Sequence, residues 1–227
     1  MIITYYGHSC FGFQMGNINL IVDPFVSPNP LAEKIDLSSI KADYILITHG
    51  HQDHVYDVEQ IAQNTKAKII SNYEIVEYFK AKGIEGYGLN LGGKRTFDFG
   101  HLKYVNAIHS SVLPDGTYGG NPGGFVIWND DIKFYIAGDT ALTLDMQLIP
   151  MTCPALDFAI LPIGDNFTMG VADAIVASDF IQCDRIIAAH YNTFPDISID
   201  EKQAKESFKR EDKQLVIMGI GESLSFE

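Results

Sequence analysis

The sequence predicts an α+β protein with two sheets and helices outside them. The chain begins with β-rich segments at residues 10–15 and 18–23, which a Gly-Asn turn joins into a hairpin. Its second half adds strand–loop–helix units, such as the apolar run at residues 157–162 and the helical pattern at 171–181. No linker, charge block or low-complexity tract divides the chain, so we expect a single domain over residues 1–227.

The remaining elements follow from local pattern. Short runs rich in Ile, Val, Phe and Tyr predict strands, and apolar residues at helical spacing predict helices. Asp57 is expected to cap the helix that starts at Val58. Gly83 is expected to end the helix at residues 72–82. Strands are expected at residues 2–6, 44–47, 67–70, 96–99, 102–109, 124–128, 132–137, 185–189 and, as the last, 214–218; helices are expected at 58–62, 72–82 and 201–209.

Composition limits the classes of function. Hydrophobic residues make up 46% and charged residues 20% of the chain, which is typical of a globular protein. The net charge of −13 opposes non-specific binding to nucleic acid, because the surface repels phosphate backbones. A small anionic substrate remains compatible, since bound metal ions would invert the local charge. Nucleic acid is therefore disfavoured as a partner, a small-molecule substrate is expected, and the sequence leaves a homo-oligomer open.

Cysteine usage and the chain start indicate the compartment. Cys10, Cys153 and Cys183 are odd in number and widely spaced, which favours free thiols in a reducing environment. The first residues show no basic segment followed by a long apolar one, and no apolar stretch reaches the roughly 18 residues of a membrane span. We expect a cytoplasmic protein without a membrane partner.

The most informative stretch follows the apolar run at residues 44–47. His49, His51, Asp53 and His54 come within six positions there, and imidazole and carboxylate are the usual ligands of zinc, manganese and iron. The His-x-His alternation lets two side chains reach one metal ion from an extended backbone, so the spacing predicts a loop and not a helix. Asp53 and His54, after the chain turns, could reach a second ion.

Three further ligand-type residues follow buried strands later in the chain. They are His109, Asp139 and His190. Because the ends of strands converge at one edge of a sheet, we expect these side chains to meet the earlier cluster. Five histidines and two aspartates are enough for two metal ions that share a carboxylate, and such a pair can hold a bridging hydroxide at neutral pH.

This combined motif resembles the metallo-β-lactamase superfamily over the whole chain and in the same order. The resemblance implies the αβ/βα four-layer sandwich of the metallo-β-lactamase fold and two divalent metal ions. Zinc is expected, with manganese or iron as alternatives. Carried over residue by residue, it implies that one ion is held by His49, His51 and His109, the other by Asp53, His54 and His190, and both by the bridging Asp139.

Finer motifs resemble the small metal-dependent hydrolase subfamily, which is similar to ascorbate 6-phosphate lactonase. They are Tyr6-Gly7-His8-Ser9, Asp23-Pro24, Leu161-Pro162-Ile163-Gly164, Phe167-Thr168-Met169-Gly170 and His190-Tyr191-Asn192-Thr193-Phe194-Pro195. The resemblance implies hydrolysis of a small ester, lactone or phosphoester by the bridging hydroxide. We expect Asp53 and His8 to be the catalytic side chains, with His8 as general acid if one is needed. Substrate contacts are expected from Thr168, Met169, Tyr191 and Asn192.

Alternatives remain open at several positions. His8 could instead be a buried histidine that orients a ligand, and Asp23 could cap a turn or support a ligand indirectly. Thr168 could be the N-cap of the following helix. Ser110 and Ser111 could supply a nucleophile only with a general base beside them. The whole chain could be a nuclease or phosphodiesterase of the same superfamily, or a metal-binding protein without efficient turnover.

Overall fold

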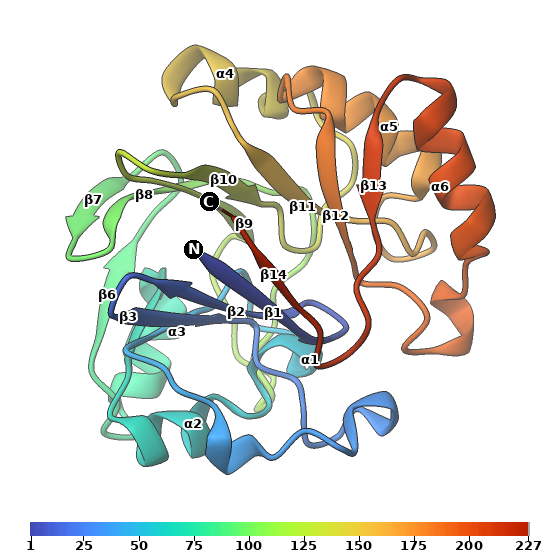
Figure 1. Ribbon diagram of the computed structural model, residues 1–227. Helices are drawn as coiled ribbons and strands as arrows, with labels where there is room; N and C mark the ends of the chain where they lie inside the picture. Colours follow the sequence, from blue (N-terminus) through green and yellow to red (C-terminus); the bar gives the residue numbers. More distant parts are fainter. Residues whose placement is uncertain (227) are drawn as a thin grey trace. The chain divides into compact units, whose positions relative to one another are not determined.

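In the computed structural model, which describes residues 1–226, the chain forms two units, each with its own seven-stranded mixed sheet (Figure 1). The first unit contains Met1–Leu91, Ser110–Pro122 and the segment from Gly219 onward. The second contains Gly92–His109 and Gly123–Met218. The chain therefore crosses between the units several times, and the expectation of one domain stays a prediction.

The first sheet has the strand order β14-β1-β2-β3-β4-β5-β6. Its strands are β1 (Ile2–Gly7), β2 (Cys10–Met15), β3 (Ile18–Val22), β4 (Tyr44–Leu46), β5 (Lys68–Asn72), β6 (Gly86–Leu89) and β14 (Ser223–Ser225). The pairs from β14 to β3 are antiparallel, and those from β3 to β6 are parallel. The carboxyl ends of β3 and β4 therefore lie at the same edge, where Asp23 and the early histidines follow.

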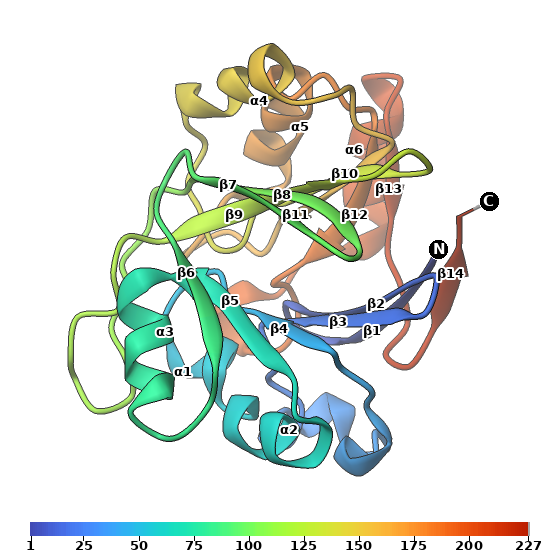
Figure 2. The ribbon, with the colours of Figure 1, turned by 90° about the vertical axis from the view of Figure 1, so that its left-hand side faces the viewer.

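Two helices, α2 (Val58–Thr65) and α3 (Tyr73–Lys80), lie on one face of the first sheet (Figure 2). They bury Ile61 and Phe79 in one apolar cluster with Ile45 of β4 and Ile69 of β5. A shorter helix, α1 (Gln52–Val55), and the 3-10 turns η1 (Pro30–Ala32) and η2 (Leu37–Ser39) complete this unit.

The second sheet has the strand order β13-β12-β11-β10-β9-β8-β7. Its strands are β7 (Lys94–Phe97), β8 (Gly100–Asn106), β9 (Gly123–Trp128), β10 (Lys133–Ile136), β11 (Phe158–Pro162), β12 (Arg185–Ala189) and β13 (Gln214–Val216). Strands β7 to β10 are antiparallel, as in a meander, and β10 to β13 are parallel. Asp139 and His190 each follow the carboxyl end of a parallel strand, β10 and β12.

Helices α4 (Leu148–Thr152), α5 (Val171–Phe180) and α6 (Glu201–Arg210) lie on one face of this sheet (Figure 2). The 3-10 turns η3 (Leu144–Gln147) and η4 (Pro195–Ile197) flank them. Tyr135, Leu161, Ile186 and Phe208 belong to the buried cluster that joins these helices to the strands. Within residues 1–226, no helix combines the length and the apolar character that crossing a bilayer requires.

Several local expectations differ from the structure. Asp53 and His54 lie on the helix α1 and not on a loop, because the chain turns directly after His51. Asp57 stands at the N-cap position of α2 but makes no capping bond, since its carboxylate accepts from the backbone N–H groups of Val26 and Ser27 and from the Ser27 hydroxyl. The helix α5 has Gly170 at its N-cap, so the alternative of Thr168 as the cap is wrong.

Candidate metal centre

Asp23 connects the ends of β3 and β4 in the first unit. Its side chain is buried, and its carboxylate accepts the Thr48 backbone N–H at 2.8 Å and the Thr48 hydroxyl at 2.7 Å. The Nδ1 of His54 lies 2.9 Å from the same carboxylate. Burial raises the pKa of Asp23, while its hydrogen bonds with His54 and Thr48 oppose that rise. The structure thus favours the indirect supporting role of Asp23 over a simple turn cap.

These hydrogen bonds determine which nitrogen of two histidines faces outward. A carboxylate only accepts, so His54 donates through Nδ1 and its Nε2 keeps the lone pair. Thr48 uses its hydroxyl proton on Asp23, so its oxygen accepts from His49 Nδ1 at 3.0 Å. The Nε2 of His49 therefore also keeps its lone pair. Neutral imidazoles fixed in this way are the form in which histidine binds a metal ion.

His51 completes a pair with His49. Its Nδ1 lies 3.0 Å from His49 Nε2, and its Nε2 lies 3.2 Å from the Ser110 hydroxyl. Two imidazole nitrogens at this separation could both reach one ion, because each Zn–N bond is about 2.0–2.1 Å long. The donor set therefore fits a metal ion at this pair.

Asp53 lies on α1 beside His54 and His8. Its Oδ2 is 3.7 Å from His54 Nε2 and 3.0 Å from His8 Nε2. The His8 side chain is fully buried, whereas that of Asp53 is 28% exposed. His8 adopts a left-handed backbone conformation with φ of 56°, which turns the chain between β1 and β2. This arrangement favours His8 as the residue that orients Asp53.

The second unit brings its three predicted ligands together. Asp139 is buried, and its Oδ2 lies 3.1 Å from His190 Nε2 and 3.6 Å from His109 Nε2. The strand β8 ends at Asn106, three residues earlier than expected, so His109 lies beyond it in the following loop. The Ile108 N–H donates to the Thr140 hydroxyl at 3.0 Å. This bond ties the His109 segment to the loop of Asp139. The Asp139 carboxylate thus lies beside the imidazoles of both His109 and His190.

The four expected substrate residues all belong to the second unit, and two of them are packed inside it. Met169 is fully buried in the apolar cluster, and its N–H donates to the Thr140 carbonyl at 3.0 Å. Tyr191 is 6% exposed, and its hydroxyl donates to the Met218 carbonyl. These contacts favour packing roles for both side chains, and substrate contact through them stays untested.

Asn192 and Thr168 are only partly buried. Asn192 accepts the Ile199 N–H at 2.8 Å and donates to Glu201 at 3.1 Å, so it shapes the loop after β12. Thr168 donates its hydroxyl to the neighbouring Met169 carbonyl at 3.3 Å. Neither pattern tests a substrate role. The sequence assigns Thr48, at the start of the ligand stretch, no role of its own, and it suggests Ser110 only as a nucleophile. Their roles depend on contacts with residues far along the chain.

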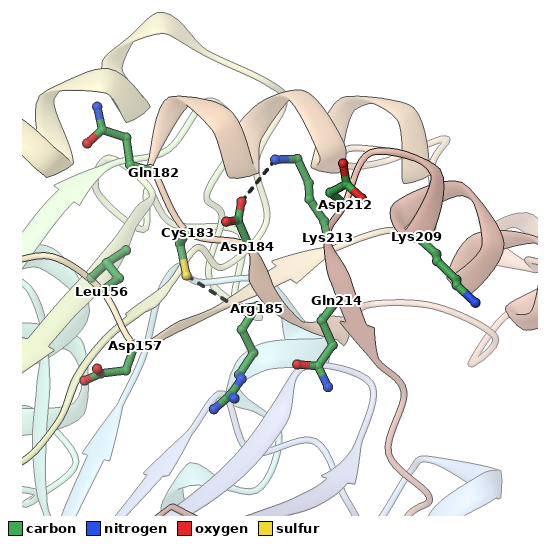
Figure 3. Close-up of a pocket in the computed structure, with 10 residues that line it drawn as sticks. All are labelled: Leu156, Asp157, Gln182, Cys183, Asp184, Arg185, Lys209, Asp212, Lys213 and Gln214. Carbon is green, nitrogen blue, oxygen red and sulfur yellow. Dashed lines mark hydrogen bonds and ion pairs between the residues drawn. The ribbon is translucent and has the colours of Figure 1, made fainter.

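The second unit also has a surface hollow of about 780 Å³ (Figure 3). It is lined by Leu156, Asp157, Gln182, Cys183, Asp184, Arg185, Lys209, Asp212, Lys213 and Gln214. Arg185 and Gln214 are the first residues of β12 and β13, so the hollow lies at the amino ends of these strands. His190 follows the other end of β12. The hollow therefore contains none of the predicted site residues.

Comparison with known proteins shows the family to which the chain belongs. A family model described as "Beta-lactamase superfamily domain" matches residues 2–190. A protein of Christiangramia forsetii named "UPF0173 metal-dependent hydrolase" is 55% identical over 99% of both chains. A relative of the same name from Flavobacterium johnsoniae is 56% identical over 99% of both chains. The chain belongs to this metal-dependent hydrolase family of the metallo-β-lactamase superfamily.

The solved structure of Igni18, a metallo hydrolase from the archaeon Ignicoccus hospitalis, resembles this metal-dependent hydrolase. The TM-score is 0.90 at 34% identity, with 100% of this chain and 98% of the other covered. The predicted fold class is confirmed by this match and by the two mixed sheets with flanking helices. The metal-dependent hydrolase is thus an enzyme with histidine and aspartate groups able to bind metal.

Proposed function

We propose that the ligands of the two units serve one binuclear centre that hydrolyses a small ester, lactone or phosphoester. In this proposal His49, His51 and His109 hold one ion, and Asp53, His54 and His190 hold the other. Asp139 would be shared by both ions; its Oδ2 lies 3.6 Å from His109 Nε2 and 3.1 Å from His190 Nε2, one histidine of each set. The observation that carries the proposal is that Asp23 and Thr48 leave the Nε2 atoms of His54 and His49 as lone-pair donors.

Two divalent ions, when bound, supply a nucleophilic water at neutral pH and polarise the bond to be cleaved. The protein's own residues hold and orient the reacting groups. Asp23 and Thr48 keep two imidazoles neutral and aimed outward, and His8 orients the Asp53 carboxylate at 3.0 Å. A lactone or ester needs little help for its leaving group, so a separate general acid is not required by this scheme.

The test combines metal analysis with a substrate panel. Purified protein is loaded in turn with Zn²⁺, Mn²⁺ and Fe²⁺, the bound ions are counted per chain, and esters, lactones, phosphomonoesters and phosphodiesters are assayed. His51→Ala and Asp139→Ala are expected to lose bound metal and turnover together. His101→Ala is the matched control, because His101 lies on β8 and pairs with the Thr96 hydroxyl at 2.8 Å.

The alternatives predict other outcomes of this test. Full metal content without turnover over the whole panel would support a metal-binding protein. Salt-dependent RNA binding and cleavage would support a nuclease, against which the net charge of −13 speaks. Full metal content and turnover in Asp139→Ala would overturn the binuclear proposal. A cytoplasmic location and an anionic substrate remain predictions from the sequence.

A further inference from the structure

Ser110 and Ser111 follow a proposed ligand, yet the proposed reaction gives them no role. Within the first unit, Ser110 Oγ lies 3.2 Å from His51 Nε2. The structure therefore pairs this serine with an imidazole, as a nucleophile would require. The protonation of His51 decides what the contact means.

The other ring nitrogen of His51 is already directed at His49. His51 Nδ1 lies 3.0 Å from His49 Nε2, which keeps its lone pair because Thr48 accepts from His49 Nδ1. If His49 Nε2 and His51 Nδ1 bind the same ion, His51 Nδ1 cannot carry the proton of the neutral imidazole. The proton is then on Nε2, and the Ser110 oxygen, 3.2 Å away, can accept it in a hydrogen bond. An imidazole with a proton on Nε2 cannot activate a serine through that atom.

Ser111 holds the Ser110 segment against the ligand loop. The Gly50 N–H, between His49 and His51 in the chain, donates to Ser111 Oγ at 3.0 Å. The Ser111 hydroxyl donates in turn to the Gly119 carbonyl at 2.8 Å, and the Gly119 N–H donates back to the Ser111 carbonyl at 3.1 Å. The position of Ser110 relative to His51 is thus fixed by backbone contacts.

The packing around this contact is close. A Cβ added to Gly119 would lie 2.5 Å from Ser111 Oγ, and a Cβ added to Gly50 would lie 3.3 Å from the Leu113 side chain. Asn72, at the end of β5, also donates to the Gly119 carbonyl at 2.7 Å. The segment that carries Ser110 is therefore held to the ligand loop and to β5 at the same point.

We propose that Ser110 is a positioning residue for His51. Its hydroxyl oxygen accepts a hydrogen bond from the His51 Nε2–H, which leaves Nδ1 as the nitrogen that would bind the metal. Ser111 holds the Ser110 segment in place. This inference rests on the proposed metal centre. It also argues against Ser110 as a nucleophile, because a His51 that carries its proton on Nε2 cannot take the proton of the serine hydroxyl.

The test measures metal affinity and the His51 tautomer. Wild type, Ser110→Ala, Ser110→Thr and Ser198→Ala are titrated with Zn²⁺ against a chelator. Two-dimensional ¹⁵N spectra of the zinc-loaded proteins report which imidazole nitrogen carries the proton. Ser198 is an exposed serine of the second unit whose hydroxyl donates to the Phe194 carbonyl, so it is the matched control. Ser110 is itself exposed, so its truncation should leave folding intact.

We expect Ser110→Ala to bind one of the two ions about 10- to 100-fold more weakly, as when other partners of metal-bound histidines are removed. Ser110→Thr should restore the affinity, and His51 of the wild type should carry its proton on Nε2. Ser110→Ala with wild-type affinity for both ions would overturn the inference, as would a His51 proton on Nδ1. A wild type without bound metal would instead overturn the proposed function, and the inference with it.

Discussion

At the scale of single residues, the ligand geometry depends most on Asp23. One buried carboxylate accepts two bonds from Thr48 and one from His54, and through Thr48 it also determines the tautomer of His49. Partners of this kind are usually worth about 10- to 100-fold in metal affinity. The sequence left open whether Asp23 caps a turn or supports a ligand indirectly, because its partners lie 25 to 31 residues away.

Asp23→Asn should therefore weaken metal binding. The side-chain amide of this variant would present an N–H group to the Thr48 hydroxyl and His54 Nδ1, which both need an acceptor there. The tautomers of His54 and His49 would then no longer be fixed. We expect about 10- to 100-fold lower Zn²⁺ affinity in a chelator competition. Asp57→Asn is the matched control, since Asp57 is buried but bonds with Val26 and Ser27. It should lower the free energy of unfolding by about 1–3 kcal/mol without changing metal affinity. Equal metal affinities in the two variants would contradict this role of Asp23.

His8 can be tested by separating its hydrogen bond from its ring. His8→Gln keeps an N–H donor at a similar reach to Asp53, whereas His8→Ala removes it. If His8 orients Asp53, the Gln variant should retain the second ion and most of the turnover. The Ala variant should lose about 10- to 100-fold in affinity. A Gln variant with full metal but turnover reduced by about 10²-fold or more would show that His8 transfers a proton.

The thiols provide a separate check on burial. The structure describes Cys10 and Cys183 as buried and Cys153 as half-buried, all free. Burial raises the pKa of Cys183 to about 11, and it also raises that of Cys10. At pH 8 roughly a thousandth of Cys183 would be thiolate, and thiolate is the reactive form. We expect a disulfide reagent to modify one thiol quickly in the folded protein and three after denaturation. Rapid loss of a second thiol without unfolding would contradict this burial.

At the scale of elements, the ligands follow the ends of strands that the sequence makes apparent. The apolar run at residues 185–189 became β12, and the helical spacing at 201–209 became α6 with one more residue. The expected strand at 214–218 was not the last, since β14 follows it and pairs with β1. The strand β14 is short and polar, so the sequence shows no periodic apolar signal there. Its strand conformation depends on pairing with β1, more than 200 residues away in the chain. The strand β6, which pairs with β5, was also not expected, because two of its four residues are glycines.

Gly164 tests how closely two strand ends must approach. It follows β11, and a Cβ at this position would lie 2.1 Å from the His190 carbonyl oxygen. Gly164→Ala must therefore displace the backbone of His190. We expect lower turnover and weaker binding of one ion, measured together with the melting temperature. Gly219→Ala is the control, because a Cβ there meets its nearest atom at 3.5 Å. Similar metal affinity in both variants would mean that the strand ends tolerate this displacement.

At the scale of the whole molecule, the sequence predicts a set of metal ligands but does not identify the substrate. Ligands have few chemical types and recur at strand ends, so a motif can reveal them. Met169 and Tyr191 were expected at the pocket, but both are buried, and only their packing distinguishes such roles. Asp53 and His54 were placed in a loop, although a short helix carries them. Loop shape depends on contacts that no local pattern encodes.

Metal should also stabilise the folded chain. A ligand that binds only the folded state at 100 times its Kd adds about 2.7 kcal/mol to the free energy of unfolding. We expect thorough removal of metal by a chelator to lower Tm by several degrees and re-addition of Zn²⁺ to restore it. Asp139→Ala should show no such shift for the ions it fails to bind. A Tm that does not respond to metal in the wild type would contradict tight binding.

The most direct measurement is the number of metal ions bound per chain. It is determined by elemental analysis of the loaded wild type, Asp139→Ala and His101→Ala. We predict about two ions in the wild type and in His101→Ala, as two-metal hydrolases hold, and fewer in Asp139→Ala. A wild type that retains none, or an Asp139→Ala variant that keeps the full number, would contradict the binuclear centre.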